Sequence, residues 1–188
     1  MAKSRVLVVN NGTLSLKQLR SRFEEFGSET EVAAADALPA RLDGRYQAVV
    51  LSGTKVRAYD GEFYKPLIDL VNEADVPVFG ICGGMQVIAV AAGGRLAEGP
   101  QRVGGHRAQV DREEPLFAYV GPEVTVFHRH TLYLQEAPAG FRSIGRSEHA
   151  PVEFIRSEDG RILGSQAHLE FRSDGREILR GFARLYQQ

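Results

Sequence analysis

Short apolar runs alternate with helical patterns through the first half of the chain, and this alternation constrains the fold more than any other feature. The runs at 6–9, 48–51 and 76–79 are aliphatic or β-branched nearly throughout, which is typical of strands buried on both faces of a parallel sheet. Between them, apolar residues recur at spacings of three and four over 16–26 and 63–71, as in amphipathic helices. The order predicts an α/β fold, a mostly parallel central sheet with helices on both faces.

The second half of the chain follows a different pattern. Short stretches of alternating apolar and polar residues replace the earlier runs, and two of them, 152–155 and 162–165, flank the turn sequence Ser-Glu-Asp-Gly at 157–160. Such a pair indicates a hairpin, so we expect a small antiparallel β element, followed by a final helix over about 175–186. At this length the whole chain, 1–188, is expected to form one domain.

The charge balance argues against nucleic-acid and lipid partners. Lys and Arg total 23 against 24 Asp and Glu, for a formal net charge of −1, so the chain lacks the basic surface that binds phosphates. Its first apolar run is too short for a signal peptide, and no stretch approaches the ~18 apolar residues that span a bilayer. We therefore expect a cytoplasmic protein with neither nucleic acid nor membrane as a partner.

The only cysteine, Cys82, lies where a buried strand is followed by a helix. A single cysteine excludes an intrachain disulfide and cysteine-rich zinc sites. Gly80, Gly83 and Gly84 surround it, and a nucleophile elbow, the sharp strand-to-helix turn that presents a nucleophile, needs small residues on both sides. The helix N-terminus would also favour a thiolate. A lone cysteine is more often a small buried hydrophobic residue, but the flanking glycines favour a nucleophile.

A cysteine nucleophile needs a base that also protonates the leaving group, and imidazole suits both tasks near neutral pH. His168 follows the strand predicted at 162–165 and precedes Glu170 by two residues. In an extended segment residues i and i+2 lie on the same side, so Glu170 can orient His168 and stabilise its cation. A His-x-Glu sequence occurs often by chance, so this pair supports a catalytic role only in combination with the predicted nucleophile elbow. Two other histidines, His128 and His130, alternate along a further predicted strand.

Taken together, these segments resemble the class I glutamine amidotransferases, a family that hydrolyses glutamine and passes the ammonia to a synthase. The resemblance covers nearly the whole chain, including the Ser-Gly pair at 52–53, the elbow at 80–86, and the sequences at 137–141 and 164–170. In length and layout the chain is similar to the free-standing glutaminase subunits of the family, among them that of GMP synthetase. The resemblance implies a flavodoxin-like fold.

The same resemblance implies a catalytic triad and a binding site for L-glutamine. Cys82 would attack the side-chain amide, His168 would shuttle the proton, and Glu170 would orient His168. Backbone N–H groups would hold the oxyanion, from Gly83 and from the loop that contains Gly53 and Thr54. The remaining substrate-binding residues that it implies are Gln86, His130 and Thr131. No metal or organic cofactor is implied, and the ammonia would pass to a separate synthase or synthetase subunit.

Three segments depart from the family's usual sequence. The oxyanion loop, usually Ser-Gly-Gly-Pro, reads Ser-Gly-Thr-Lys at 52–55, so a β-branched residue that resists positive φ replaces a glycine, and a partner could be needed to flip the loop. Leu169 replaces the proline of His-Pro-Glu, with little expected effect. The usual Ser-His-Gly-Asp reads Arg-His-Thr-Leu at 129–132, which removes a glycine and an acid beside the expected glutamine pocket.

Two alternatives to an ammonia-supplying glutaminase stay open. The same triad could serve a γ-glutamyl amide or peptide hydrolase that channels no ammonia, or the domain could regulate or scaffold a partner without catalysis. We expect no ATP-binding synthetase domain within these 188 residues, which also lack a Gly-rich phosphate loop with Lys and Ser or Thr. The leading expectation is a glutaminase whose acceptor lies on another chain, with GMP synthesis as the first candidate pathway.

Overall fold

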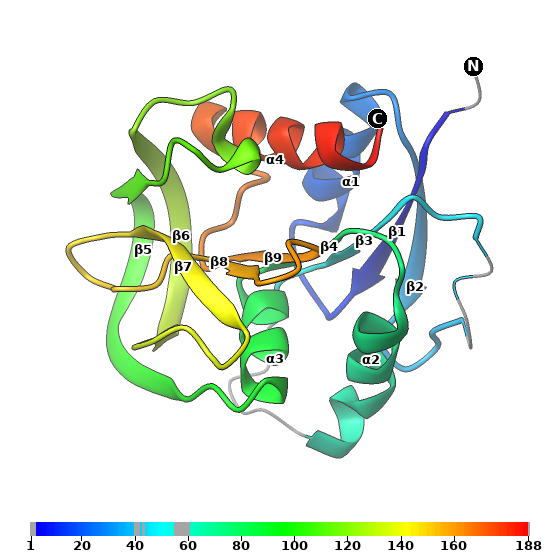
Figure 1. Ribbon diagram of the computed structural model, residues 1–188, viewed down its shortest axis with the longest axis horizontal. Helices are drawn as coiled ribbons and strands as arrows, with labels where there is room; N and C mark the ends of the chain where they lie inside the picture. Colours follow the sequence, from blue (N-terminus) through cyan, green and yellow to red (C-terminus); the bar gives the residue numbers. More distant parts are fainter. Residues whose placement is uncertain (1–2, 40–41, 43, 55–60, 188) are drawn as a thin grey trace.

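The computed structural model describes residues 3–39, 42, 44–54 and 61–187. In this part of the chain nine strands form one mixed sheet, and four α-helices pack against its two faces (Figure 1). In chain order the elements are β1 (Arg5–Asn10), α1 (Leu16–Glu25), β2 (Glu29–Ala34), β3 (Ala48–Leu51), α2 (Gly61–Glu73), β4 (Val78–Ile81), α3 (Gly83–Ala91), β5 (Leu96–Val110), the 3-10 helix η1 (Pro115–Phe117), β6 (Glu123–Leu134), β7 (Phe141–Arg146), β8 (Phe154–Ser157), β9 (Ile162–Ser165) and α4 (Ser173–Tyr186).

The sheet has the strand order β2-β1-β3-β4-β9-β8-β7-β5-β6. The pairs from β2 through β9 are parallel, as the alternating first half predicts, and the pairs from β9 through β6 are antiparallel. The predicted hairpin is β8 and β9. Because β9 also pairs with β4, the antiparallel element continues the parallel sheet and does not form a separate layer.

The strand β5 has no counterpart in the expectations from the sequence. It spans 15 residues and pairs with β6 along almost its whole length, with a shift in register between Glu98 and Arg102. Gly99, Pro100 and the Gly104–Gly105 pair interrupt its alternation of polar and apolar residues, which conceals the strand from a reading of periodicity. The segment is therefore a strand because it pairs with β6, and its own sequence pattern does not indicate one.

Two hydrophobic layers cover the two faces of the sheet. The helices α1 and α4 lie on one face and α2 and α3 on the other (Figure 1). Successive residues of β1 alternate between the layers, so that Val6 and Val8 join the cluster with α1 and α4, whereas Leu7 and Val9 join the cluster with α2 and α3. Burial on both faces explains why such runs are apolar throughout. Every helix in the described residues is too short or too polar to traverse a lipid bilayer.

The carboxyl ends of β1, β3, β4 and β9 meet at one edge of the sheet. The pairing aligns Val9 with Leu51, Leu51 with Gly80, and Ile81 with Ser165, so the four strands end at nearly the same level. The segments that follow them are therefore brought side by side. In open α/β sheets this edge is where ligands bind.

The packing of α4 against the sheet gives a test of the core. Phe182 is fully buried, and its ring lies edge-on to Phe79 and Phe23 at centroid distances of 5.0 and 6.4 Å. Because truncation leaves a cavity, we expect Phe182→Ala to lower the free energy of unfolding by about 3–5 kcal/mol in urea denaturation followed by circular dichroism. The matched control is Phe63→Ala, at a position that is 47% exposed, with an expected loss below about 1 kcal/mol. Equal losses would contradict the assigned core.

Candidate active site

Cys82 occupies a sharp turn between β4 and α3. Its backbone has φ 49° and ψ −106°, a conformation that residues with a side chain rarely adopt. The turn is held from both sides, because the N–H of Cys82 donates to the Ser165 carbonyl at 2.7 Å and its carbonyl accepts from the Gln86 N–H at 3.0 Å. This is the geometry of a nucleophile elbow.

Two glycines of the elbow are required by close backbone packing. A Cβ atom on Gly80 would lie 2.6 Å from the backbone nitrogen of Met85, and a Cβ atom on Gly84 would lie 2.5 Å from the Leu51 carbonyl oxygen. Both distances are far below van der Waals contact, and the neighbouring atoms are backbone. A side chain at either position would push α3 away from β3 and β4, so the spacing Gly-x-Cys-x-Gly is a steric requirement of this turn.

His168 and Glu170 follow β9 and lie on the same side of the extended segment, as their spacing predicts. The Nδ1 atom of His168 lies 2.9 Å from Oε1 of Glu170, which leaves Nε2 for Cys82. Glu170 is almost completely buried and also accepts a hydrogen bond from the hydroxyl of Ser15. The backbone N–H of His168 donates to the Phe127 carbonyl at 2.7 Å. Imidazole and carboxylate are thus both fixed in orientation.

The electrostatic surroundings keep His168 positively charged. Burial lowers the pKa of His168, but its hydrogen bonds and charge interactions with Cys82 and Glu170 outweigh that effect and raise the pKa to about 10. The imidazolium therefore persists at neutral pH. A cation beside a cysteine favours the thiolate, the nucleophilic form of the side chain.

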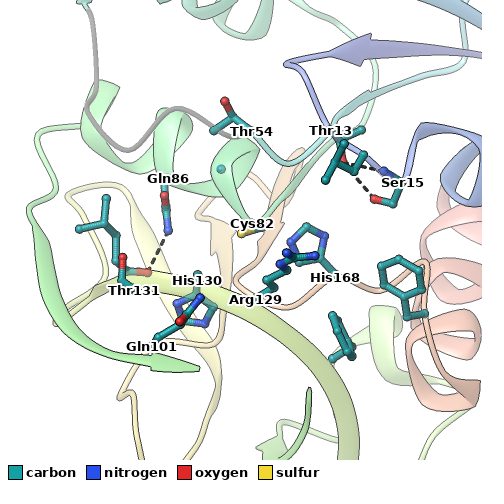
Figure 2. Close-up of a pocket in the computed structure, with 15 residues that line it drawn as sticks. Thr13, Ser15, Thr54, Cys82, Gln86, Gln101, Arg129, His130, Thr131 and His168 are labelled. Atoms are coloured by element: carbon teal, nitrogen blue, oxygen red, sulfur yellow. Dashed lines mark hydrogen bonds between the residues drawn. The ribbon is translucent and has the colours of Figure 1, made fainter. Parts of the chain in front are cut away.

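Cys82 and His168 line a pocket of about 460 Å³. Figure 2 shows the two side chains close together, with Gln86 and His130 on one side and Ser15 on the other. Of the residues that the sequence singled out, those that line this pocket are Thr54, Cys82, Gly83, Gln86, His130, Thr131 and His168. Glu170 lies behind His168. Among the described residues, no group of three or more His, Cys, Asp or Glu side chains could hold a metal ion.

The loop after β3 lies against both the elbow and the imidazole. A Cβ atom on Gly53 would lie 2.9 Å from Cε1 of His168, and one on Gly83 would lie 2.8 Å from the backbone nitrogen of Thr54. Thr54 has no positive φ, in keeping with its β-branched side chain. Its hydroxyl lies 3.4 Å from that of Tyr64 and points away from Cys82 in Figure 2. Lys55, the next residue, lies outside the described residues.

Two polar residues of the site were missed by reasoning from the sequence. Gln166 places its amide nitrogen 3.7 Å from the Cys82 sulfur, and the i, i+2 spacing that links His168 to Glu170 could also have linked Gln166 to His168. Ser15, by contrast, is separated from Glu170 by 155 positions. No local signal in the sequence connects such a pair, since the contact depends on how α1 packs.

A buried histidine backs the pocket wall. The Nδ1 atom of His128 lies 2.9 Å from Nε2 of His130, and its Nε2 atom lies 3.7 Å from Oε2 of Glu153, which pairs with Arg102 at 2.6 Å. Burial, with a smaller effect of the Arg102 charge, lowers the pKa of His128 to about 2 and that of His130 to about 4. Both imidazoles are therefore neutral at pH 7, so His168 and Arg129 carry the positive charge among the described residues of the pocket lining.

Comparison with known proteins relates the chain to one family. The family described as Glutamine amidotransferase class-I matches residues 7–184. The glutamine-hydrolysing GMP synthase of Thermosipho africanus is 31% identical over 94% of this chain, which corresponds to only 35% of that protein. A protein of Methanopyrus kandleri, named as one subunit of the glutamine-hydrolysing GMP synthase, is 28% identical and is covered over 97% of its length, with 96% of this chain. The chain thus spans about a third of the first relative and nearly all of the second.

Solved structures share the fold. A Thermoplasma acidophilum protein that carries the provisional name of a GMP synthase subunit superposes with a TM-score of 0.89 at 24% identity, covering all of this chain and 96% of that one. A glutamine amidotransferase of Thermotoga maritima superposes with a TM-score of 0.80 at 21% identity, covering all of this chain and 84% of that one. At these identities the likeness concerns the arrangement of the sheet and helices.

The neutral state of His128 predicts sensitivity to acid. The unfolded chain binds a proton on this residue below pH ~6.5, whereas the folded state resists it down to about pH 2. Its contribution to stability is therefore complete above pH ~6.5 and is lost as the pH falls. Between pH 6.5 and 4.5 we expect this residue to contribute a decline of about 1.4 kcal/mol per pH unit in the free energy of unfolding.

The measurement is urea denaturation across this pH range. The decline in the free energy of unfolding per pH unit should be smaller in His128→Gln by about 1.4 kcal/mol. It should stay unchanged in His149→Gln, which alters an exposed position. An unchanged slope in His128→Gln would contradict a neutral, buried His128.

Proposed function

The chain belongs to the class I glutamine amidotransferase family, and we propose that it is a glutaminase that hydrolyses L-glutamine to glutamate and ammonia through a γ-glutamyl thioester on Cys82. The observation that carries the proposal is the elbow at Cys82 beside an imidazolium that Glu170 orients. The ammonia passes to a separate synthase or synthetase chain. The relatives named GMP synthase, one of them a separate subunit of that enzyme, support GMP synthesis as the pathway.

In the first half of the reaction, the Cys82 thiolate attacks the side-chain amide carbon of glutamine and forms a C–S bond. The carbonyl oxygen becomes an oxyanion. His168, charged at neutral pH, gives its Nε2 proton to the amide nitrogen, and the C–N bond breaks. Ammonia leaves, the γ-glutamyl thioester stays on Cys82, and His168 is left neutral.

In the second half, neutral His168 takes a proton from water, which attacks the thioester carbon. The second oxyanion intermediate collapses, the C–S bond breaks, and the thiolate of Cys82 is regenerated beside the imidazolium. Glutamate leaves as the product. Glu170 supports both halves, because its buried carboxylate fixes the imidazole through Nδ1 and stabilises its cation, while Ser15 holds the carboxylate in turn.

The oxyanion of both intermediates is assigned to two backbone N–H groups. One belongs to Gly83, the first residue of α3, where N–H groups without helical partners and the positive end of the helix dipole favour an anion. The other belongs to the loop at Gly53 and Thr54, whose backbone packs on Gly83. Removal of one such donor typically costs a factor of about 10²–10³ in kcat.

Recognition of glutamine is assigned to the wall of the pocket that β6 and α3 form. Gln86, His130 and Thr131 line it, together with Arg129, which Figure 2 shows extending toward the side of the pocket that holds His168. None of the described lining residues is acidic, and Arg129 has no ion-pair partner in the described part of the chain. We therefore assign Arg129 to the α-carboxylate of the substrate, since an unpaired guanidinium binds carboxylates well.

Glutamate release from glutamine by the purified chain is the first test of this function. We expect Cys82→Ala to abolish the release, because the thioester cannot form, and to leave the free energy of unfolding nearly unchanged. Release by the native chain should rise when the separate synthase subunit of its pathway is added. Hydrolysis of N-substituted γ-glutamyl amides in preference to glutamine would instead support a γ-glutamyl hydrolase, and no Cys82-dependent reaction with either would support a non-catalytic domain.

The role of Arg129 can be tested with two substrates. Because Arg129→Gln removes the cation that meets the α-carboxylate, we expect it to raise KM for glutamine roughly tenfold with little change in kcat. The same substitution should leave the hydrolysis of 4-aminobutanamide, which lacks that carboxylate, unchanged. Arg107→Gln, on the exposed part of β5, is the matched control. Equal losses of kcat/KM with both substrates would exclude a carboxylate contact.

A further inference from the structure

Two amide side chains connect the pocket wall to the sulfur of Cys82. The side-chain nitrogen of Gln86 donates to the Leu132 carbonyl at 3.0 Å and to Oε1 of Gln166 at 3.2 Å. The side-chain nitrogen of Gln166 then donates to Sγ of Cys82 at 3.7 Å. This chain of hydrogen bonds therefore begins at a backbone carbonyl of the pocket wall and ends at the thiol of Cys82.

The hydrogen bonds fix the direction of both amides. The carbonyl of Leu132 can only accept, so the group of Gln86 that faces it must be the NH₂ group. That NH₂ group also faces Gln166, which therefore presents its oxygen to Gln86. Its remaining NH₂ group must then face Cys82. The backbone carbonyl of Leu132 thus sets the donor that the sulfur meets, whatever side chain residue 132 carries.

Gln166 has little freedom to turn away from the sulfur. Its side chain is fully buried, and its backbone N–H donates to the Glu153 carbonyl at 2.8 Å. A buried amide group that loses its partner is destabilised by about 1–3 kcal/mol, so a rotation that exposed the oxygen to a thiolate would be doubly unfavourable. The N–H therefore remains directed at Sγ.

We propose that Gln166 is a further catalytic residue, which stabilises the negative charge on the Cys82 sulfur, and that Gln86 is a positioning residue that acts through it. An N–H bond to a charged acceptor is roughly twice as strong as one to a neutral acceptor. The contact is therefore strongest whenever the sulfur is a thiolate, as it is when it attacks the substrate and again when it leaves the second intermediate. The hydrogen bond from Gln166 weakens when the sulfur is part of the neutral thioester. This role of Gln166 during the reaction rests on the proposed function.

Alkylation of the thiol by iodoacetamide tests this contact directly. Because Cys82 is the only cysteine, its rate of alkylation can be followed as a function of pH without other thiols. We expect Gln166→Glu to lower the rate at pH 7 by at least about tenfold and to displace the rate curve toward higher pH, since a carboxylate oxygen repels the thiolate. Gln166→Met removes the donor without adding a charge, and a smaller displacement in the same direction is expected.

A matched control and a second route exclude a merely structural effect. Gln109→Glu makes the same change on the exposed face of β5 and should leave the rate curve unmoved. Gln86→Met removes the donor that orients the Gln166 amide, so we expect it to displace the alkylation rate curve toward higher pH as well. If the Gln166 variants do not fold, this variant tests the contact in their place. Folded variants at Gln166 and Gln86 with the native rate curve would overturn the proposal.

The result is independent of the glutaminase assay. Alkylation requires no glutamine, so a displaced rate curve together with no glutamate release would reject the proposed function alone. Glutamate release together with an unmoved rate curve would reject the role of Gln166 alone. Lower unfolding free energy in the Gln166 variants without any change in the rate curve would assign this residue to packing only.

Discussion

The close approach of α3 to the strands β3 and β4 is the constraint on which the rest of the site depends. Backbone atoms of the opposite element leave no room for a Cβ atom on Gly80 or Gly84, and Cys82 between them has a positive φ. Such a conformation costs of order 1–3 kcal/mol, and the backbone bonds of Cys82 to Ser165 and Gln86 offset part of that strain. The turn thereby directs the thiol and the N-terminus of α3 into one pocket.

Charge in the site is distributed by burial and by pairing. Burial lowers the pKa of His168, but hydrogen bonds and charge interactions with Cys82 and Glu170 outweigh that effect and keep the imidazole positive. Burial keeps His128 and His130 neutral, and a neighbouring arginine adds to the effect. His168 can therefore transfer protons, whereas the neutral His128 and His130 only form part of the pocket wall and its support. The same residue type is thus charged at one position and neutral at two others of one site, because only His168 has partners whose effect exceeds that of burial.

Much of the fold could be predicted because its signals are local. Burial on both faces makes the runs in β1, β3 and β4 almost entirely apolar, and the turn at Gly160 marks the hairpin of β8 and β9. The strand β5 could not be predicted, since its glycines and proline carry no alternation and only its pairing with β6 makes it a strand. Similarly, the spacing of His168 and Glu170 predicts their hydrogen bond, but the hydroxyl of Ser15 on the same carboxylate leaves no trace in the sequence.

The sequence by itself determined the alternation of strands and helices in the first half of the chain, the glycines of the elbow, and the cysteine and His-x-Glu pair as candidates for the site. Those features follow from backbone periodicity and from steric limits within a few residues. Only the tertiary structure decided that Gln166 donates to the thiol, that Arg129 enters the pocket without an acidic partner in the described residues, and that His128 stays neutral. These are contacts between residues far apart in the chain, and they exist only once the strands are paired and the helices packed.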